Sequence, residues 1–336
     1  MARRILLISL GSIGRRHLRN VRKMLPDAEI CIWRHRPGDT PSEADGAAFV
    51  YSAEDALSFA PDAVLISSPA SFHAEQCALF CARGIPVFVE KPLEVSQSRL
   101  APLHAALSTG GGKLFVGYVL RFQPVMAALR QALDDGVVGK VRLAHIATGQ
   151  YLPDWRADAD YRDGVSAQAA LGGGVLLELS HEVDYARWFF GQPQSVTAET
   201  GRFSGLDMDV EDAATMVLGY PDKQVSITVD FLQRVPAMTL KVTGSEGTLH
   251  ADLITETARI STPAGEQVPD LPKMESGNEM YLRQLDAFLC EAFDDYAPAF
   301  EGSRNSPHAG FEDAGAVLGI VDAARLSALE GRRISL

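Results

Sequence analysis

The sequence predicts an α/β protein of two domains, a doubly wound parallel sheet over residues 1–120 and an α+β domain with a mostly antiparallel sheet over residues 121–336. Three observations predict this architecture. Short apolar runs alternate with helical patterns in the first third of the chain, as a parallel sheet with crossover helices requires. A glycine turn follows the first of these runs. Further along, β-rich runs follow one another without helices between them, which favours antiparallel pairing.

Composition narrows the class of protein. With 46% hydrophobic and 22% charged residues, the chain is typical of a globular protein rather than a disordered one. Its net charge of −12 disfavours a nucleic-acid or anionic-membrane partner. The four cysteines form no C-x-x-C pair and no zinc-like cluster, so we expect buried thiols and no metal. No apolar run has the length of a signal core or a membrane helix, and we expect a cytoplasmic protein.

The expected elements of the first domain alternate regularly. Apolar strands are predicted at residues 5–10, 29–33, 63–67, 86–90 and 113–117. Helices are predicted at residues 15–24, 70–83 and 95–107. The β-branched and apolar strands suit a sheet that is covered on both faces. Six such strands would complete a doubly wound sheet near residue 120.

The second domain begins with a helix expected at residues 124–133. Strands follow at residues 141–148, 196–200, 213–218, 225–231, 238–243 and 248–251. The segment 261–276 has the composition of a long polar loop, and helices near 280–292 and 312–328 close the chain.

The segment Ser9-Leu10-Gly11-Ser12-Ile13-Gly14 joins the first strand to the first helix. We expect Gly11 to allow a turn with positive φ, and Gly14 to allow close contact between helix and strand. The helix N-terminus would then face a pyrophosphate. Ser9 stands where the full fingerprint has another glycine, so an ordinary tight turn is the alternative. Its position between a strand and a helix favours a Rossmann domain. The expected contacts to the dinucleotide come from Ser9, Gly11, Ser12, Ile13 and Gly14.

The end of the second strand bears on the choice of cofactor. An NAD-selective Rossmann domain usually has an acid about 20 residues after the glycine turn, on the ribose hydroxyls. The sequence there is Trp33-Arg34-His35-Arg36, without a carboxylate. Arg34 and Arg36 could pair with a 2′-phosphate, which favours NADP over NAD modestly. A solvated basic loop is the alternative.

Four segments occur in a characteristic order: Gly11 to Gly14, Ser68-Pro69-Ala70-Ser71-Phe72-His73, Glu90-Lys91-Pro92 and Gly117-Tyr118-Val119-Leu120-Arg121-Phe122. Together they resemble the glucose-fructose oxidoreductase, inositol dehydrogenase and rhizopine-catabolism (Gfo/Idh/MocA) family, over nearly the whole chain. The resemblance implies an N-terminal Rossmann domain, a C-terminal domain with an open sheet that often mediates dimers or tetramers, and a cleft between them. It also implies an NAD(P)-dependent dehydrogenase or reductase acting on CH-OH groups.

The resemblance implies further cofactor contacts. It assigns these to Ser68, Pro69, His73, Glu90, Lys91, Tyr118 and Arg121. Lys91 would touch the reacting hydroxyl and the nicotinamide region, and its bond to Pro92 is expected to be cis. The alternatives are a surface lysine before a proline turn for Lys91, and a structural role for Arg121.

Glu178, His181 and Asp184 are spaced by three, so one helix would place them along one face. The resemblance implies that an acid and a histidine of this helix serve the reacting hydroxyl. Here the acid is Glu instead of the family's usual Asp, and its spacing to the histidine is three instead of four. His181 would remove the hydroxyl proton, Lys91 would stabilise the alkoxide, and Glu178 or Asp184 would orient the imidazole. A hydrogen-bonded core histidine is the alternative.

The substrate is expected from the aromatic and guanidinium side chains that follow residue 150. Tyr151, Trp155, Tyr161 and Arg162 suit a sugar ring with an anionic substituent. An interdomain or subunit contact is equally compatible with them. The sequence thus predicts oxidation of a secondary alcohol of a sugar, cyclitol or nucleotide-sugar by a homodimer or homotetramer. A non-catalytic, dinucleotide-binding regulator of a sugar pathway is the alternative, because fold alone does not guarantee activity.

Overall fold

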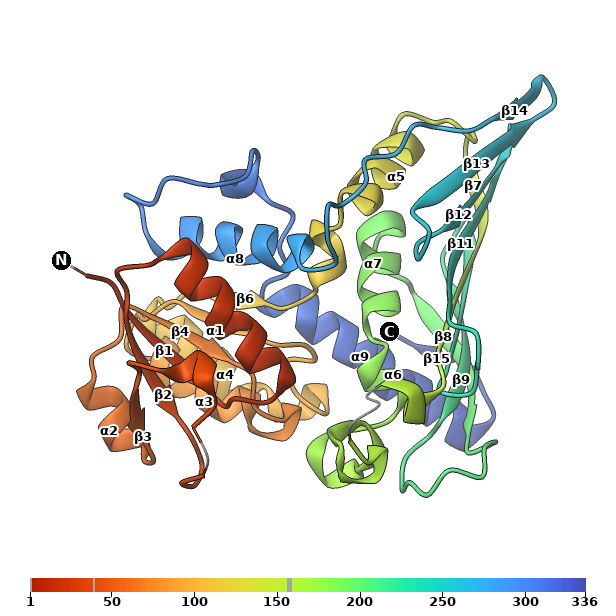
Figure 1. The fold of residues 1–336 in the computed structure, drawn as a ribbon. Helices are drawn as coiled ribbons and strands as arrows, with labels where there is room; N and C mark the ends of the chain where they lie inside the picture. The colour runs from red at the N-terminus through yellow and green to blue at the C-terminus, as the bar shows by residue number, and fades with distance from the viewer. Residues whose placement is uncertain (1, 39, 156–158) are drawn as a thin grey trace. The chain divides into compact units, whose positions relative to one another are not determined.

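The structure is a computed structural model that describes residues 2–38, 40–155 and 159–336 (Figure 1). The chain divides into two compact units. The first unit comprises the described residues of Met1–Phe122 together with Ser276–Gly315. The second unit comprises those of Gln123–Glu275 together with Ala316–Leu336.

A parallel sheet forms the centre of the first unit. In its described part, six strands lie in the order β3-β2-β1-β4-β5-β6, and each neighbouring pair is parallel. Their bounds are β1 (Arg4–Ile8), β2 (Glu29–Trp33), β3 (Ala48–Val50), β4 (Ala63–Ile66), β5 (Val87–Val89) and β6 (Leu114–Val116). All of β4 is buried, as expected of a strand covered on both faces. The strand order reverses beside β1 and β4, and in such sheets ligands bind at the carboxyl ends of these strands.

The helices of the first unit are α1 (Ser12–Met24), α2 (Ala53–Ser58), α3 (His73–Cys81), α4 (Ala101–Gly110) and α8 (Glu279–Ala292). The last of these comes from the far end of the sequence. Leu285, Phe288 and Leu289 of α8 share one apolar core with Leu18 and Val21 of α1. The expected division at residue 120 assigned this helix to the second domain, whereas its buried apolar face completes the first unit.

A second sheet dominates the other unit. Its described strands lie in the order β14-β13-β12-β11-β7-β10-β9-β8-β15, where β7 and β10 are parallel and the other pairs antiparallel. Their bounds are β7 (Val141–Gly149), β8 (Ser195–Gly201), β9 (Ala213–Gly219), β10 (Gln224–Asp230), β11 (Ala237–Gly244), β12 (Thr248–Asp252), β13 (Thr257–Thr262), β14 (Gly265–Gln267) and β15 (Ile334–Ser335). The expected polar loop at 261–276 thus contains β14 and the end of β13.

Burial alternates along these strands, so one face of the sheet packs on the core. Helices α5 (Pro124–Asp134), α6 (Val175–Glu178) and α7 (His181–Phe190) belong to this unit, and α7 lies along one face of the sheet in Figure 1. Helix α9 (Phe311–Glu330) begins in the first unit and ends in the second. The opposite face of the sheet exposes polar side chains and Leu143, which is 41% exposed.

Candidate active site

The glycine turn has an unexpected division of roles. The residue with positive φ is Ser9, at 75°, whereas Gly11 is extended with φ −64° and ψ −175°. The expectation of a positive φ at Gly11 is therefore wrong. Ser9 takes the backbone conformation that the first glycine of the fingerprint provides, and its N–H donates to the Trp33 carbonyl at 3.0 Å. Gly14 behaves as expected, because a Cβ there would lie 2.6 Å from Ser67 Oγ.

The start of α1 can receive a phosphate. Gly11 is its N-cap and supplies no side chain, and the first turn contains no acidic residue. The free N–H groups and the positive end of the helix dipole thus remain available to an anion. A Cβ at Gly11 would meet nothing within 4 Å, so there is open space beside the turn. Ser12 and Ile13 form the first helical positions. These residues fit the pyrophosphate of a dinucleotide.

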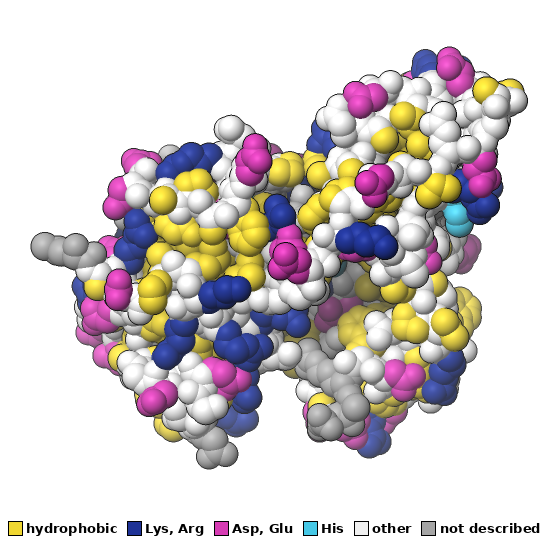
Figure 2. All heavy atoms as spheres, turned by 45° about the horizontal axis from the view of Figure 1, so that its top comes forward, with side chains coloured by type: hydrophobic (Ala, Val, Ile, Leu, Met, Phe, Trp, Pro, Cys, Tyr) yellow, Lys and Arg dark blue, Asp and Glu magenta, His cyan; other side chains and the backbone are white. Residues whose placement is uncertain are grey.

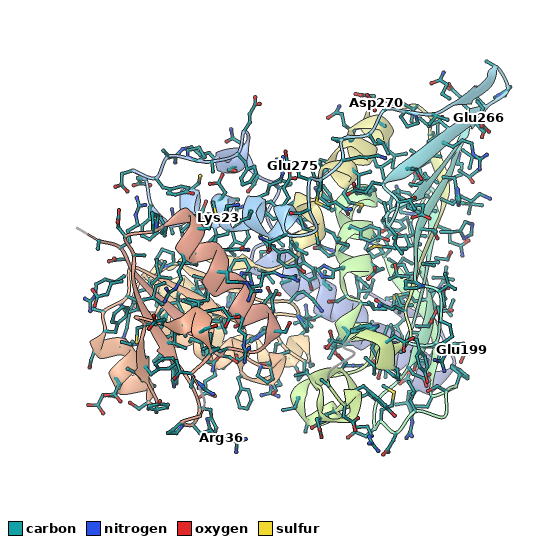
Figure 3. The ribbon with its side chains drawn as sticks, in the orientation of Figure 1. Lys23, Arg36, Glu199, Glu266, Asp270 and Glu275 are labelled. Carbon is teal, nitrogen blue, oxygen red and sulfur yellow. The ribbon has the colours of Figure 1, made fainter. Side chains whose placement is uncertain are left out.

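The two arginines after β2 occupy different environments. Arg34 is partly buried and donates to the Gly38 carbonyl at 3.2 Å. Arg36 is exposed on the loop that follows the strand (Figure 3). Both the 2′-phosphate interpretation and the basic-loop interpretation remain compatible with this geometry.

The buried His73 side chain fixes the Ser68–His73 segment. The His73 ring is 1% exposed and lies between two carbonyl oxygens, with Nδ1 2.8 Å from that of Pro92 and Nε2 2.7 Å from that of Ser68. Burial lowers the pKa of His73, although the two carbonyls and Glu90 act in the opposite direction. His73 therefore joins the turn that begins at Ser68 and Pro69 to the loop after β5, and its ring has no surface to offer a cofactor.

The Glu90-Lys91-Pro92 segment follows β5, and the Lys91-Pro92 bond is cis as expected. Lys91 is partly exposed. Glu90 is held by His17 of α1, whose Nε2 lies 2.6 Å from Glu90 Oε1. The sequence interpretation overlooked His17. The available signal was a polar residue next to Leu18 on the helix that leaves the glycine turn.

Two further expected cofactor residues are buried. Tyr118 is fully buried and Arg121 is 5% exposed. Arg121 donates to the carbonyls of Pro307 and His308 at 3.1 and 3.3 Å, and pairs with Asp313 at 3.4 Å. For Arg121 the geometry favours the structural alternative, since these contacts tie the end of the sheet to the returning segment of the first unit.

In the second unit, Glu178 and His181 lie on two helices instead of one. Helix α6 ends at Glu178 and α7 begins at His181, with Leu179 at φ −100° and ψ 33° between them. The expectation of one continuous helix is therefore wrong. His181 is partly exposed at the start of α7, whereas Asp184 is 1% exposed. Asp184 is thus oriented toward the core, and Glu178 and His181 are the more accessible groups.

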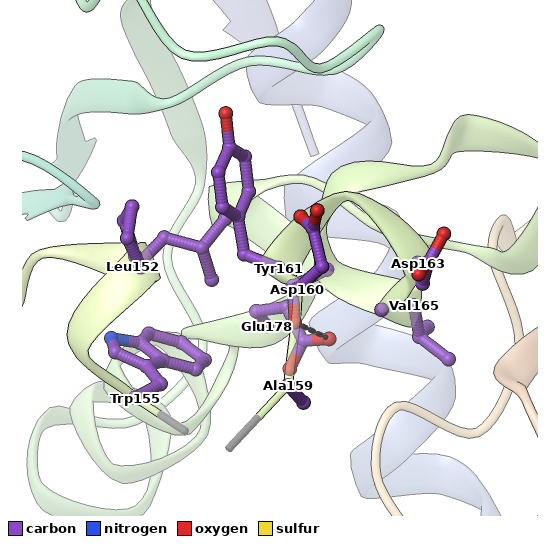
Figure 4. A pocket seen from close by; sticks show the side chains of 11 residues that line it. Leu152, Trp155, Ala159, Asp160, Tyr161, Asp163, Val165 and Glu178 are labelled. Carbon is purple, nitrogen blue, oxygen red and sulfur yellow. Dashed lines mark hydrogen bonds between the residues drawn. The ribbon is translucent and has the colours of Figure 1, made fainter. Parts of the chain in front are cut away.

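A pocket of about 450 Å³ lies beside Glu178 in the second unit (Figure 4). Its described lining consists of Leu152, Pro153, Trp155, Ala159, Asp160, Tyr161, Asp163, Gly164, Val165, Ser166 and Glu178. Ser166 Oγ donates to Glu178 Oε1 at 2.9 Å. The pocket thus combines two aromatic rings with three carboxylates, groups that suit the apolar faces and the hydroxyls of a polyol.

Two of the expected substrate residues are outside this lining. Tyr151 lies under Arg234, whose guanidinium carbon is 3.5 Å from the ring centre. Arg162 pairs with Asp160, with Nε 2.9 Å from Oδ1. This pairing, chiefly through side-chain hydrogen bonds, lowers the pKa of Asp160 to about 2. The structure therefore brings Trp155, Tyr161 and Glu178 together, but neither Tyr151 nor Arg162 with them.

Other features bear on partners. Among the described residues, no group of three His, Cys, Asp or Glu side chains could hold a metal. All four cysteines are buried and free of disulfides. Acidic and basic side chains are both spread over the face shown in Figure 2. In the part of the chain that the structure describes, no helix has the length and apolar character needed to span a bilayer.

Two family models match the chain. Residues 3–118 match the model described as an oxidoreductase family with an NAD-binding Rossmann fold, GFO_IDH_MocA. Residues 126–250 match that of the GFO/IDH/MocA C-terminal domain.

Individual relatives align with nearly the whole chain. An inositol 2-dehydrogenase of Rhizobium meliloti is 28% identical over 351 aligned residues, which cover 98% of each chain. A crystal structure of a putative myo-inositol dehydrogenase from Sinorhizobium meliloti is 25% identical, with a TM-score of 0.75 and 99% coverage of both chains. An oxidoreductase from Agrobacterium radiobacter, solved with NAD+, L-tartaric acid and magnesium, is 18% identical with a TM-score of 0.83, and the match covers 100% of this chain and 98% of that one. This last likeness concerns the fold.

Proposed function

Because the chain belongs to the Gfo/Idh/MocA family of NAD(P)-dependent oxidoreductases, we propose that it transfers hydride between nicotinamide and a secondary alcohol of a sugar or cyclitol. The observation that carries the proposal is the pocket in which Glu178 lies with Trp155 and Tyr161. The inositol 2-dehydrogenase relative supports a polyol as substrate.

The proposed mechanism assigns to each residue the role that the family resemblance implies. His181 removes the hydroxyl proton as the carbon loses hydride, and Lys91 stabilises the negative charge that develops on the oxygen. The bound nicotinamide supplies the hydride acceptor. Glu178 accepts a hydrogen bond from a substrate hydroxyl, with its carboxylate held by Ser166. Asp184, being buried, acts by positioning α7.

The charges of the pocket narrow the class of substrate that we propose. Its described lining includes Asp160, Asp163 and Glu178, and Arg162 is already paired with Asp160. A negatively charged sugar would meet carboxylates without a compensating guanidinium there. An uncharged cyclitol or sugar, whose hydroxyls donate to carboxylates, is therefore the proposed substrate in preference to a nucleotide-sugar.

The preferred cofactor is proposed to be NADP, with NAD also used. Arg34 and Arg36 follow β2 without a carboxylate beside them in the sequence. Comparing kcat/KM for the two cofactors tests this preference. Arg34→Ala and Arg36→Ala should each raise the KM for NADP by about 10-fold and leave that for NAD nearly unchanged. A wild-type preference for NAD would overturn it.

The open face of the second sheet supports self-association into a homodimer or homotetramer. Leu143 and Val217 lie on the outward side of β7 and β9, among threonines such as Thr215 and Thr228. Sedimentation equilibrium of wild type and Leu143→Glu tests this. We expect the wild type to associate and the variant to dissociate, and a monomeric wild type would contradict the proposal.

Activity itself is tested by absorbance of the reduced nicotinamide, with a panel of cyclitols, neutral sugars, sugar acids and nucleotide-sugars. We expect turnover of a neutral member. His181→Ala and Lys91→Ala should each lower kcat by roughly 10²- to 10⁴-fold. If both variants retain wild-type turnover, the mechanism is wrong. Dinucleotide binding without turnover of any member would instead favour a non-catalytic regulator.

A further inference from the structure

His17 occupies a buried position between the cofactor helix and the lysine segment. It lies three residues after Gly14 on α1 and is 2% exposed. Its Nε2 is 2.6 Å from Glu90 Oε1, and the Glu90 side chain is 12% exposed. The ring also meets Phe88 edge-on, with 5.0 Å between centroids. The contact thus links the helix that leaves the glycine turn to the residue before Lys91.

The surroundings of the other ring nitrogen, Nδ1, indicate which tautomer His17 adopts. Nδ1 is buried and has no hydrogen-bond partner among the residues that the structure describes. An imidazolium would leave its Nδ1 proton buried without an acceptor, which is costly. The neutral tautomer with its proton on Nε2 has its only N–H bonded to Glu90. A neutral His17 leaves the negative charge of the Glu90 carboxylate uncancelled.

Glu90 is confined on its other sides as well. Its Oε2 lies 3.1 Å from the position of a Cβ at Gly117, so a side chain there would push the carboxylate away. The Tyr281 ring of α8 meets the His17 ring edge-on, with 6.5 Å between centroids. Burial, and after it the Glu90 charge, raises the pKa of Tyr281. Arg16 stacks on the Tyr281 ring at 4.3 Å. The charged and titratable groups around His17 are therefore Glu90, Lys91, Arg16 and Tyr281.

We infer that His17 is a positioning residue that holds the Glu90 carboxylate as an oriented anion beside Lys91, and so aligns Lys91 with the cofactor helix. The inference rests on the proposed function, since it assigns Lys91 to the reacting hydroxyl. A single hydrogen bond thereby couples the phosphate end of the cofactor site to its catalytic end. His17 itself exchanges no proton with substrate.

Two substitutions separate the hydrogen bond from the volume of the side chain. His17→Leu removes the donor, whereas the amide of His17→Gln can donate from nearly the same place. We expect His17→Leu to lower kcat by up to about 100-fold and to shift the midpoint of the pH–rate profile, because small displacements of catalytic groups have effects of this size. His17→Gln should recover kcat to within about 3-fold of wild type. The Kd for reduced cofactor, measured by fluorescence, should change by less than about 3-fold in both.

Asn20→Leu is the matched control. Asn20 is 3% exposed on the same helix and bonds to Asn278, the N-cap of α8, so its loss also removes a part-buried contact that α1 makes. We expect it to lower the Tm without moving kcat or the pH–rate profile. If His17→Leu behaves in the same way, the role of His17 is only structural and the inference is overturned.

The tautomer provides a readout that does not depend on activity. Nitrogen NMR of labelled enzyme with bound NADPH at pH 7.5 should show His17 protonated on Nε2 and not on Nδ1. An imidazolium signal at pH 7.5 would overturn the inference even if the enzyme turns over its substrate. The two proposals can fail separately. If NMR shows the neutral tautomer but the protein oxidises no alcohol, the proposed function is refuted and the assignment of the His17 tautomer stands.

Discussion

A Cβ on Gly14 would lie 2.6 Å from both the Ser67 hydroxyl oxygen and the Ser9 carbonyl oxygen. Ser67 is itself fixed, because its hydroxyl donates to the Ile8 carbonyl at 3.0 Å. Gly14→Ala must therefore displace α1 from the carboxyl ends of β1 and β4. We expect unfolding to become easier by about 1–3 kcal/mol and dinucleotide affinity to fall. Urea unfolding and cofactor fluorescence measure the two effects.

Gly11→Ala is the control for Gly14→Ala. Its Cβ would meet nothing within 4 Å, and its φ is −64°. Opposing effects of roughly 1 kcal/mol on the helix cap and on the unfolded chain should leave the free energy of unfolding nearly unchanged. The added methyl group would still occupy the space beside the turn and weaken dinucleotide binding. Equal destabilisation by the two alanines would contradict this account of Gly14.

Ser9 carries the positive φ of the turn, at 75°. A non-glycine residue in this conformation costs roughly 1–2 kcal/mol of stability. Glycine avoids this cost, but it also increases the entropy of the unfolded chain, which offsets part of the gain. We therefore expect Ser9→Gly to stabilise the protein by about 0.5 kcal/mol. Ser9→Val, with a branched Cβ, should destabilise it by about 1–3 kcal/mol. Denaturant midpoints distinguish these, and a destabilised glycine variant would show that the Ser9 side chain matters more than its backbone.

Most elements of the parallel sheet could be predicted because buried strands are continuous apolar runs flanked by turns. The strand β3 was not located, since it is short and only partly buried. The return of α8 to the first unit could not be predicted either. Its apolar face indicates burial but not the partner, and Phe288 meets Phe88 and Phe115 across about 170 or more residues of sequence.

The site was less predictable than the fold. The assignment of positive φ to Gly11 followed residue type, but the strand end imposed it on Ser9. The Glu178 and His181 spacing suited one helix, because nothing in Leu179-Ser180 resembles a helix stop. The role of His17 depends on a contact 73 residues away, which no local pattern encodes. Arg162 appeared available in the sequence, yet Asp160 two residues earlier binds it.

Glu178 provides a test of the pocket that is independent of the cofactor. Glu178→Gln keeps the shape of the side chain but removes its charge, and Ser166→Ala removes the 2.9 Å hydrogen bond that orients it. We expect kcat/KM for the alcohol to fall by about 10- to 100-fold in Glu178→Gln and by about 10-fold in Ser166→Ala. Steady-state kinetics with the preferred alcohol measures both.

Glu199→Gln is the corresponding control, because Glu199 is exposed on β8 of the same unit (Figure 3). It should have wild-type kinetics. The Kd for reduced cofactor should stay within about 2-fold of wild type in all three variants. Loss of even one hydrogen bond to the cofactor would change the Kd by more than this. A Glu178→Gln variant that loses cofactor affinity but keeps kcat/KM would place the carboxylate outside the substrate pocket.

The buried His73 and the half-buried His308 of the first unit give a pH dependence of stability with a definite sign. Burial is the largest cause that lowers the pKa of His73, and likewise that of His308. Unfolding restores an ordinary pKa of about 6.5, so below that pH the unfolded chain binds more protons than the folded one. Stability from these groups is complete above the unfolded pKa and is lost as the pH falls through the folded pKa.

We therefore expect the free energy of unfolding to decrease as the pH falls from 7.5 to 5.5. His73→Gln should be less stable at pH 7.5, because Gln cannot reach both the Ser68 and Pro92 carbonyls as the ring does. The free energy of unfolding of this variant should also depend less steeply on pH than that of the wild type. Adding His308→Gln should reduce this slope further. Urea unfolding at closely spaced pH values measures these slopes. An unchanged slope in the double variant would mean that other groups, such as the carboxylates, cause the acid sensitivity, and would contradict the assignment to His73.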